Sequence, residues 1–189
     1  MSIIPPILEK ALYKTSSGLN IIFKVLFRGG LKIEEVIRLI LMHDDHFLKC
    51  ADIIVIHIGH NNIMNKNGTY AIKNVNELYT KYNILIQNVK TICPSAILVF
   101  SGLLPRVGHR LAKYNDMCRY LNRNFTKIFN NLSINHFRQF CSGKNNVIHQ
   151  MYIMRGRFPG VHLNEVGKHQ LANNIVMFLC KNILWKRQC

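Results

Sequence analysis

The chain has 189 residues, which is enough for one domain with its own core. Its composition, with 49% apolar and 18% charged residues, excludes an intrinsically disordered protein. Twenty-five Lys and Arg against nine Asp and Glu give a formal net charge of +16. Such an excess favours polyanionic partners, namely nucleic acid, acidic glycans or an anionic membrane surface. The basic residues are dispersed, however, and no stretch interleaves them with aromatic residues, so a solvated basic surface is the alternative explanation.

The six cysteines form no Cys-x-x-Cys pair and no Cys/His metal spacing, so neither a metal nor a cofactor is expected. Cys50, Cys93 and Cys180 end apolar segments, which is typical of reduced, buried thiols. No apolar run reaches the ~20 residues of a membrane span, and Pro5 and Pro6 interrupt any signal-peptide core. An intracellular, cytoplasmic protein is therefore expected, with its oligomeric state left open.

In chain order, the hydrophobic pattern alternates between helical and extended segments. Helical spacing of apolar residues covers 7–13, 32–41, 75–92, 111–129 and 164–184. Runs of β-branched and other apolar residues predict strands over 19–27, 51–58, 96–100 and 134–140. Strands that alternate with helices of crossover length indicate a parallel sheet covered by helices on both faces. Because no linker or internal repeat interrupts the pattern, residues 1–189 are expected to form a single α/β domain.

The expected layout also predicts where function lies. In open parallel sheets, ligands bind beyond the carboxyl ends of the strands. Three loops fit that position, Gly29-Gly30, Gly59–Asn62 and Ser101–Arg106, and Gly160–Asn164 before the last helix would be a fourth wall. We expect the functional site around this last segment.

Individual residues in these loops suggest a chemistry. An Asn amide after a strand can donate to a developing oxyanion. The alternative is that Gly59–Asn62 is only a structural turn, which uses Gly and Asn for left-handed conformations. His162 is a candidate base or an ordinary surface histidine. Arg106 could position an anionic group or simply cap its loop. His57, within the predicted strand 51–58, is expected to be structural, and the role of His60 stays open.

Four stretches, in this order, resemble the SGNH (GDSL-type) hydrolases, particularly the esterase-like domains of retrotransposon-derived proteins. They are Gly29-Gly30-Leu31-Lys32-Ile33, Ile54–Asn62, Ser101–Arg106, and Gly160–Asn164 with Gly167. The resemblance implies a three-layer α/β/α sandwich with a central parallel, flavodoxin-like sheet. It also implies a serine nucleophile served by a histidine base.

Carried over residue by residue, the resemblance assigns roles to this chain. The base would be His162, and the oxyanion donors would be a backbone N–H of Gly29 or Gly30 and the side chain of Asn61. Further binding positions would be Gly59, His60, Asn62, Arg106 and Asn164.

This sequence departs from the family pattern at the nucleophile and at the acid. The family's Gly-Asp-Ser turn is missing; Ser2 lies at about the right distance from Gly29, but nothing before it could form the supporting strand. The aspartate that normally orients the histidine is replaced by Pro159, and Asn62 replaces the Asp of the Gly-x-Asn-Asp block. After Glu77 the sequence offers two carboxylates as a substitute acid, Asp116 and Glu165, and Glu165 follows His162 by three residues.

These departures lead to three hypotheses. The chain is an SGNH-type domain, ancestrally a serine esterase or acyl hydrolase, that is catalytically impaired and binds a small ester or acetylated sugar. Alternatively it is a working hydrolase with Ser2 or a displaced serine as nucleophile, or a non-catalytic module for nucleic acid or another polyanion. A further interpretation is an N-terminally shortened copy of a longer gene, whose sheet would lack its first strand.

Overall fold

The computed structural model describes residues 30–42, 49–64, 69–71, 75–108, 111–129, 132–142, 146–154 and 160–184. These residues belong to two compact units. The sheet unit comprises the described residues of Gly30–Leu103 and Met117–Ser133, and the C-terminal unit comprises Leu104–Asp116 and the described residues from Ile134 onward. Both units draw on separated stretches, so no single cut divides the chain between them. The single domain over 1–189 stays a prediction.

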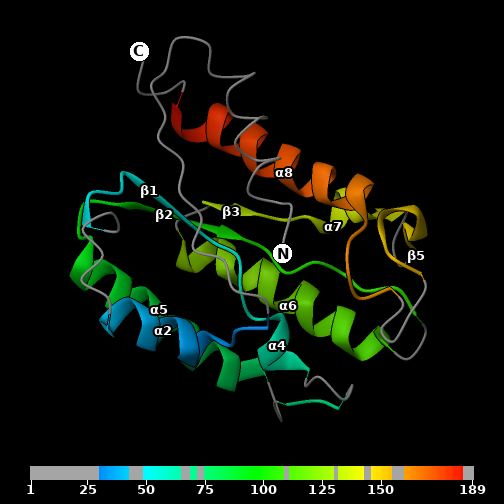
Figure 1. The fold of residues 1–189 in the computed structure, drawn as a ribbon, viewed down its shortest axis with the longest axis horizontal. Helices are drawn as coiled ribbons and strands as arrows, with labels where there is room; N and C mark the ends of the chain where they lie inside the picture. The colour runs from blue at the N-terminus through cyan, green and yellow to red at the C-terminus, as the bar shows by residue number, and fades with distance from the viewer. Residues whose placement is uncertain are drawn as a thin grey trace. The chain divides into compact units, whose positions relative to one another are not determined.

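The sheet confirms the α/β class predicted from sequence (Figure 1). Strand β1 (Ile53–Ile56) pairs in parallel with β2 (Ile97–Ser101), with Ile53 opposite Ile97 and Ile56 opposite Phe100. The strand order is β1-β2-β3, with β3 limited to Ser133–Ile134. The last four residues of β2 are buried, whereas β1 buries only Ile56, which is less than expected for a strand of a sheet covered on both faces.

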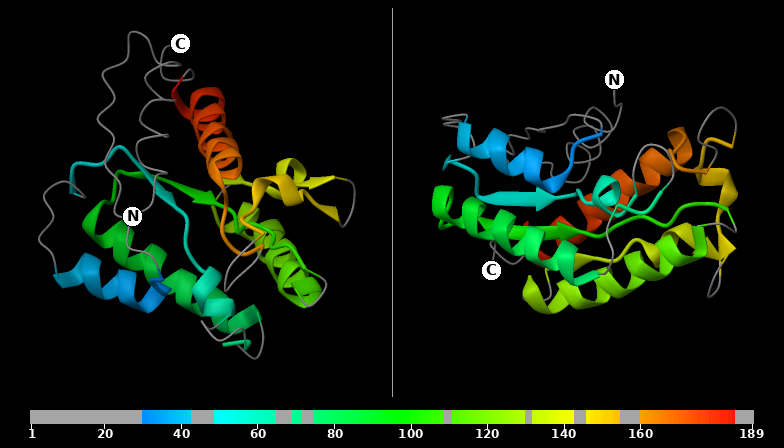
Figure 2. Two further views of the ribbon diagram at one scale, coloured as in Figure 1. Left: turned by 45° about the vertical axis from the view of Figure 1, so that its right-hand side comes forward. Right: turned by 90° about the horizontal axis from the view of Figure 1, so that it is seen from below.

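Three helices of the predicted lengths accompany the sheet. They are α2 (Ile33–Met42), α5 (Val75–Ile92) and α6 (Ala112–Ile128). In sequence order α5 links β1 to β2 and α6 links β2 to β3, which are the crossovers that a parallel sheet requires. Helices α2 and α5 lie alongside each other within the sheet unit (Figures 1 and 2).

The core of the sheet unit is built around Phe125 of α6. Its ring centroid lies 4.4 Å from those of both Tyr82 on α5 and Phe100 on β2, and 5.1 Å from that of Tyr79. Phe100, Tyr82 and Phe125 are fully buried. Edge-to-face and tilted aromatic contacts therefore join two helices and one strand into a single packed cluster.

The C-terminal unit contains α8 (Glu165–Leu179), which continues as a π-helical segment η3 (Cys180–Leu184). The 3₁₀ turn η2 (His149–Met151) packs against α8. Short strands β4 (Cys141–Ser142) and β5 (Asn146–Val147) pair antiparallel. The expectation of a helix over 164–184 is thus confirmed for most of its length.

The strand predicted over 134–140 is wrong beyond Ile134, because helix α7 (Phe137–Phe140) follows β3. The Asn135 side chain accepts a hydrogen bond from the Phe137 N–H at 3.1 Å and turns the backbone there. Phe137 and Phe140, three residues apart, are then buried on the same side of one helical turn.

Several sequence-based expectations concern other parts of the chain. The predicted segments 7–13 and 19–27, and with them the question of a missing first strand, lie outside the described residues. Cys93 and Cys180 are buried as expected, whereas Cys50 is exposed and that expectation is wrong. Across the described part of the chain, no helix combines the length and the apolar character needed to cross a bilayer.

The loop after β2 is held by a buried asparagine. The Leu103 N–H donates to Asn122 Oδ1 at 2.8 Å, and Asn122 Nδ2 donates back to the Leu103 carbonyl at 2.9 Å. Leu103 is fully buried and Asn122 is 2% exposed. Because neither backbone group of Leu103 belongs to a helix or strand ladder, the Asn122 amide supplies partners that buried polar groups require.

We expect Asn122→Ala to lower the free energy of unfolding by about 2–4 kcal/mol, because it leaves two buried backbone groups without partners. Urea denaturation followed by circular dichroism measures this loss. The matched control is Asn124→Ala on the same helix, whose amide bonds only to the exposed Tyr120 carbonyl, and which should change stability by less than about 0.5 kcal/mol. Equal losses for the two variants would contradict the assignment.

Candidate functional site

The Gly59–Asn62 loop begins with a glycine that no other residue can replace. Gly59 has φ of 116° and lies directly before helix α4 (His60–Ile63). A Cβ at this position would collide with the hydroxyl of Tyr82, which itself donates to the Ile58 carbonyl. The turn interpretation therefore holds for Gly59, whereas Asn61 and Asn62 are helical rather than left-handed.

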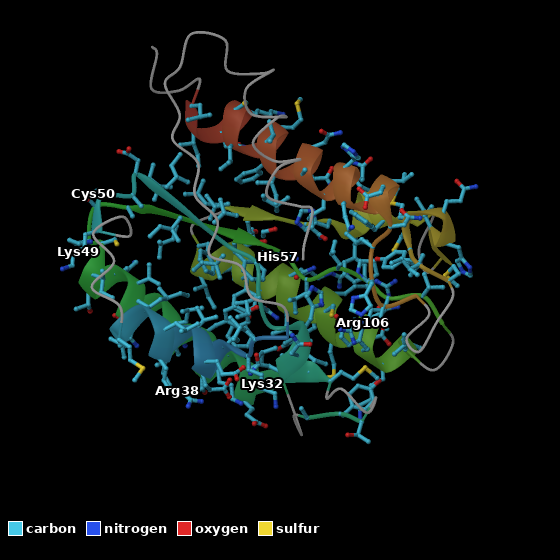
Figure 3. All side chains as sticks on the ribbon, in the orientation of Figure 1. Lys32, Arg38, Lys49, Cys50, His57 and Arg106 are labelled. Atoms are coloured by element: carbon cyan, nitrogen blue, oxygen red, sulfur yellow. The ribbon has the colours of Figure 1, made fainter. Side chains whose placement is uncertain are left out.

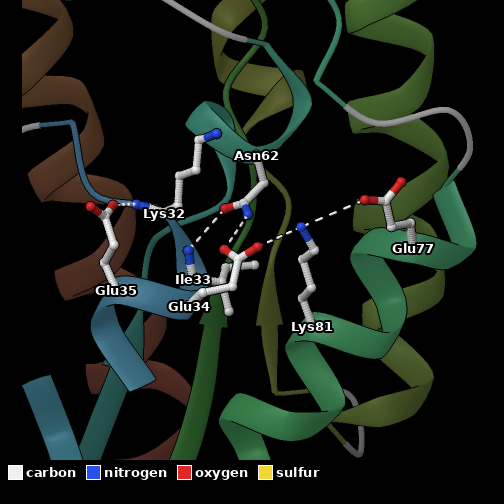
Figure 4. A network of polar contacts seen from close by, with 7 residues as sticks. All are labelled: Lys32, Ile33, Glu34, Glu35, Asn62, Glu77 and Lys81. Atoms are coloured by element: carbon white, nitrogen blue, oxygen red, sulfur yellow. Dashed lines mark hydrogen bonds and ion pairs between the residues drawn. The ribbon is translucent and has the colours of Figure 1, made fainter. Parts of the chain in front are cut away.

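Asn62 locks this loop onto the start of α2 (Figure 4). Its Oδ1 accepts the Ile33 N–H at 3.0 Å, and its Nδ2 donates to Glu34 Oε2 at 2.8 Å. Asn62 is 1% exposed. The Ile33 N–H is one of the first N–H groups of α2, which find no partner within their own helix. Asn62 thus caps α2 from helix α4, and both the oxygen and the nitrogen of its amide have partners inside the protein.

Glu34 extends this contact into an ion-pair network. Lys81 Nζ lies 2.5 Å from Glu34 Oε1 and 3.6 Å from Glu77 Oε1. Burial tends to raise the pKa of Glu34, but hydrogen bonds from Lys81, from the backbone and from Asn62 outweigh it and lower that pKa. Glu34 is therefore a carboxylate at neutral pH, and it needs a donor rather than a second acid at position 62.

Asn61 is bonded to the segment that follows Gly30. Its Nδ2 donates to the Leu31 carbonyl at 3.2 Å, directly after Gly30, whose φ is 84°. An amide carries two N–H donors, and this contact uses one of them. Gly29, the other expected backbone donor, lies outside the described residues.

His57 is structural in the sheet unit, as the sequence suggested. It follows β1 (Figure 3). Its Nδ1 lies 3.1 Å from both the carbonyl oxygen and Oγ of Ser101 at the end of β2. Burial lowers the pKa of the imidazole, and the backbone hydrogen bond to Ser101 only partly counteracts this. Ser101 is fully buried. A neutral His57 therefore ties the ends of two strands, and its ring lies 5.5 Å from that of His60.

In the C-terminal unit, the Gly160–Asn164 loop is fixed through its backbone. The Ile153 N–H donates to the His162 carbonyl and the Gly160 N–H to the Ile153 carbonyl, both at 2.8 Å. Gly160 has φ of 73°, and a Cβ there would meet Val107. The loop is thus held on both sides of His162, while the His162 side chain itself is exposed.

Asn164 ends this loop and starts α8. Its side chain accepts the Gly167 N–H at 3.0 Å as the N-cap, and its Nδ2 donates to the Gln150 carbonyl at 2.7 Å. Gly167 packs so tightly on the Met151 carbonyl that a Cβ would clash with it. Asn164 and Gly167 therefore fix where the helix starts, which sets the position of the loop before it.

The acid that should orient His162 has no substitute among its described neighbours in sequence. Glu165 Oε1 lies 2.7 Å from Lys168 Nζ and is engaged there. The described residues provide no hydrogen bond or ion pair for the His162 ring. Ser2 and Pro159 lie outside the described residues. Among the described residues, no three His, Cys, Asp or Glu side chains gather as a metal site.

Arg106 is held through its backbone by Asn115, and its side chain contacts Tyr114. The backbone N–H of Arg106 donates to Asn115 Oδ1 at 2.8 Å, and Asn115 Nδ2 donates to the backbone carbonyl of Arg106 at 2.9 Å. Its guanidinium lies 4.5 Å above the centre of the Tyr114 ring, where a cation–π contact forms. Binding of an anionic group by Arg106 stays a prediction.

Sequence reasoning missed Asn115 and Asn122, which hold the Ser101–Arg106 loop and the residues around it. The signal was present as two asparagines seven residues apart within the apolar stripe of one helix. Polar residues at such positions are buried and need partners, and a loop with unpaired backbone groups supplies them.

The fold can be compared with those of known proteins. No family model and no curated protein matches the sequence. Among solved structures, a Streptococcus pneumonia protein described as a candidate platelet activating factor superposes with a TM-score of 0.64 at 18% identity, over 92% of this chain and 79% of that one. A Desulfitobacterium hafniense protein assigned to the lipolytic G-D-S-L family gives a TM-score of 0.63 at 11% identity, over 91% and 87%.

A family 3 carbohydrate esterase from Clostridium thermocellum gives a TM-score of 0.61 at 17% identity, over 92% of this chain and 85% of that one. The chain has an SGNH-hydrolase-like fold. At such low identity the comparison concerns the fold and leaves the roles of individual SGNH-site residues as proposals. The link to retrotransposon-derived proteins stays a prediction.

Because Asn62 contacts the Glu34 carboxylate, we expect aspartate at position 62, the residue of the SGNH pattern, to lower the stability of this protein. Asn62→Asp would set two carboxylates at contact distance, so the pair must hold a proton and its folded-state pKa rises. The loss of stability should be about 3 kcal/mol at pH 7 and clearly smaller at pH 4.5, because a raised pKa destabilises the fold as the pH increases through it. Urea unfolding at both pH values measures this difference.

Adding Glu34→Gln to Asn62→Asp is the matched control, since it removes the facing charge and should restore most of the stability at pH 7. A loss that is the same at both pH values, or that Glu34→Gln does not relieve, would show that position 62 does not face the Glu34 carboxylate.

Proposed function

We propose that this domain is a catalytically impaired SGNH-type hydrolase that binds a small ester or acetylated sugar. The observation that carries the proposal is His162, whose loop is fixed on both sides while its ring has no acid partner among the described residues. The structure thus supports ligand binding by such a site, whereas proton transfer by His162 is not supported.

The oxyanion side supports binding of an acyl group. Asn61 would offer its second amide hydrogen to a ligand, and its contact with Leu31 holds it beside the segment that contains Gly30. Donors that are fixed in advance stabilise an acyl oxygen without a cost of reorganisation. The Clostridium neighbour is a carbohydrate esterase, and another structural neighbour is an acetyl esterase with an acetate ion, which favours acetylated ligands.

The histidine side supports impairment. A catalytic imidazole needs a partner at Nδ1 to fix its tautomer and to stabilise the imidazolium that forms during proton transfer. Loss of that partner costs about 10⁴ in rate in serine protease triads. Glu165 does not compensate, because it pairs with Lys168.

Turnover of p-nitrophenyl acetate should therefore be indistinguishable between the unmodified protein and His162→Ala, and a fluorophosphonate probe should leave the protein unlabelled. Labelling that Ser2→Ala abolishes, together with turnover that depends on His162, would establish a working hydrolase instead.

Binding is tested separately by NMR titration with xylose tetraacetate. Asn61→Ala should weaken binding about 2- to 10-fold, as expected for one lost hydrogen bond. Asn88→Ala is the matched control, because that exposed amide bonds only to the Ile84 carbonyl one turn earlier on α5. Absence of binding, or equal effects of the two variants, would contradict the proposed ligand class.

A further inference from the structure

One face of α6 gathers cations around an exposed aromatic ring. Arg119, Arg123 and Lys127 follow one another at intervals of four residues, and Tyr120 lies beside this row, three residues before Arg123. We call these four residues the cationic face. The opposite side of the same helix is its buried stripe, which includes Cys118, Leu121, Asn122 and Phe125.

Tyr120 is the aromatic centre of this face. Tyr120 is 53% exposed, whereas tyrosine is usually partly buried in folded proteins. Tyr79 of α5 stacks on Phe125, with ring centroids 5.1 Å apart, and Phe125 belongs to the same helix as Tyr120. The exposed Tyr120 ring is therefore carried by a helix that the aromatic core of the sheet unit holds in place.

The surrounding charges leave the face positive. Helix α6 carries four Lys and Arg residues against the single acid Asp116. On α5, which supplies Tyr79, the single acid is Glu77, and its carboxylate is paired with Lys81 in the network of Figure 4. Asp116 lies three residues before Arg119 on this side of α6, so the face together with Asp116 has a net charge of +2 in a chain of net charge +16.

We propose that the cationic face of α6 binds single-stranded nucleic acid, with phosphates on Arg119, Arg123 and Lys127 and a base stacked on Tyr120. Grooves for single strands combine cations that follow the backbone with aromatic rings that accept any base. Stacking on Tyr120 requires an exposed base. The bases of a duplex are already stacked on one another, and anionic lipids and glycans have none, so the exposed Tyr120 favours a single strand over other polyanions. This surface is independent of the proposed acyl site.

The test measures fluorescence anisotropy of a fluorescein-labelled U12 RNA between 50 and 200 mM salt. The triple variant Arg119→Gln/Arg123→Gln/Lys127→Gln should weaken binding at least tenfold. It should also reduce the slope of log affinity against log salt by about 2, since each single-strand phosphate contact contributes about 0.7. Tyr120→Ala should weaken binding about 5- to 100-fold with little change in that slope.

The matched control is Arg38→Gln/Lys90→Gln/Lys181→Gln, which removes the same charge from exposed positions on other helices and should weaken binding less than threefold. Equal losses for the two triple variants would overturn the proposal in favour of diffuse charge. An unchanged affinity in Tyr120→Ala, or equal binding of a 12-base-pair duplex, would overturn the stacking and make the face a general polyanion surface.

Discussion

The loops of this fold depend on asparagine side chains that bond to backbone groups which no helix or strand can satisfy. Asn62 accepts the first N–H of α2, Asn122 pairs with both backbone groups of Leu103, and Asn115 does the same for Arg106. Asn164 caps α8 and holds the carbonyl of Gln150. A single amide can donate and accept at once, which a carboxylate cannot do at neutral pH, so it matches the N–H and C=O of one peptide backbone.

This constraint explains how the chain keeps a hydrolase-like fold while its chemistry differs from the SGNH pattern. The pattern's aspartate in the Gly-x-Asn-Asp block would be repelled here, because Glu34 is already a carboxylate paired with Lys81. The loop thus keeps its position through a different donor. His162 has no comparable replacement, since Glu165 is directed to Lys168. The backbone of the Gly160–Asn164 loop is therefore fixed by its own unit, while the described residues give the His162 ring no acid partner.

Much of this fold could be predicted from hydrophobic periodicity, because helices α5 and α6 bury their apolar stripes on one core. The segment 134–140 could not, since Phe137 and Phe140 fit a short strand or one helical turn equally well and Asn135 decided between them. Pairings over long sequence distances, such as Asn62 with Glu34, leave no local pattern. The cationic face does leave a local pattern, since Arg119, Tyr120, Arg123 and Lys127 lie within nine residues, and the helical spacing of α6 brings them to one side.

The central claim is that His162 lacks an orienting acid, and its ring protons test this most directly. In ¹H–¹⁵N NMR spectra of the histidine side chains, His57 serves as an internal reference, because its Nδ1 is fixed by Ser101 and should show one tautomer with a slowly exchanging proton. The account predicts that His162 shows averaged tautomers and no such proton at Nδ1. A protected, strongly downfield Nδ1 proton on His162 would reveal a carboxylate partner and contradict the account.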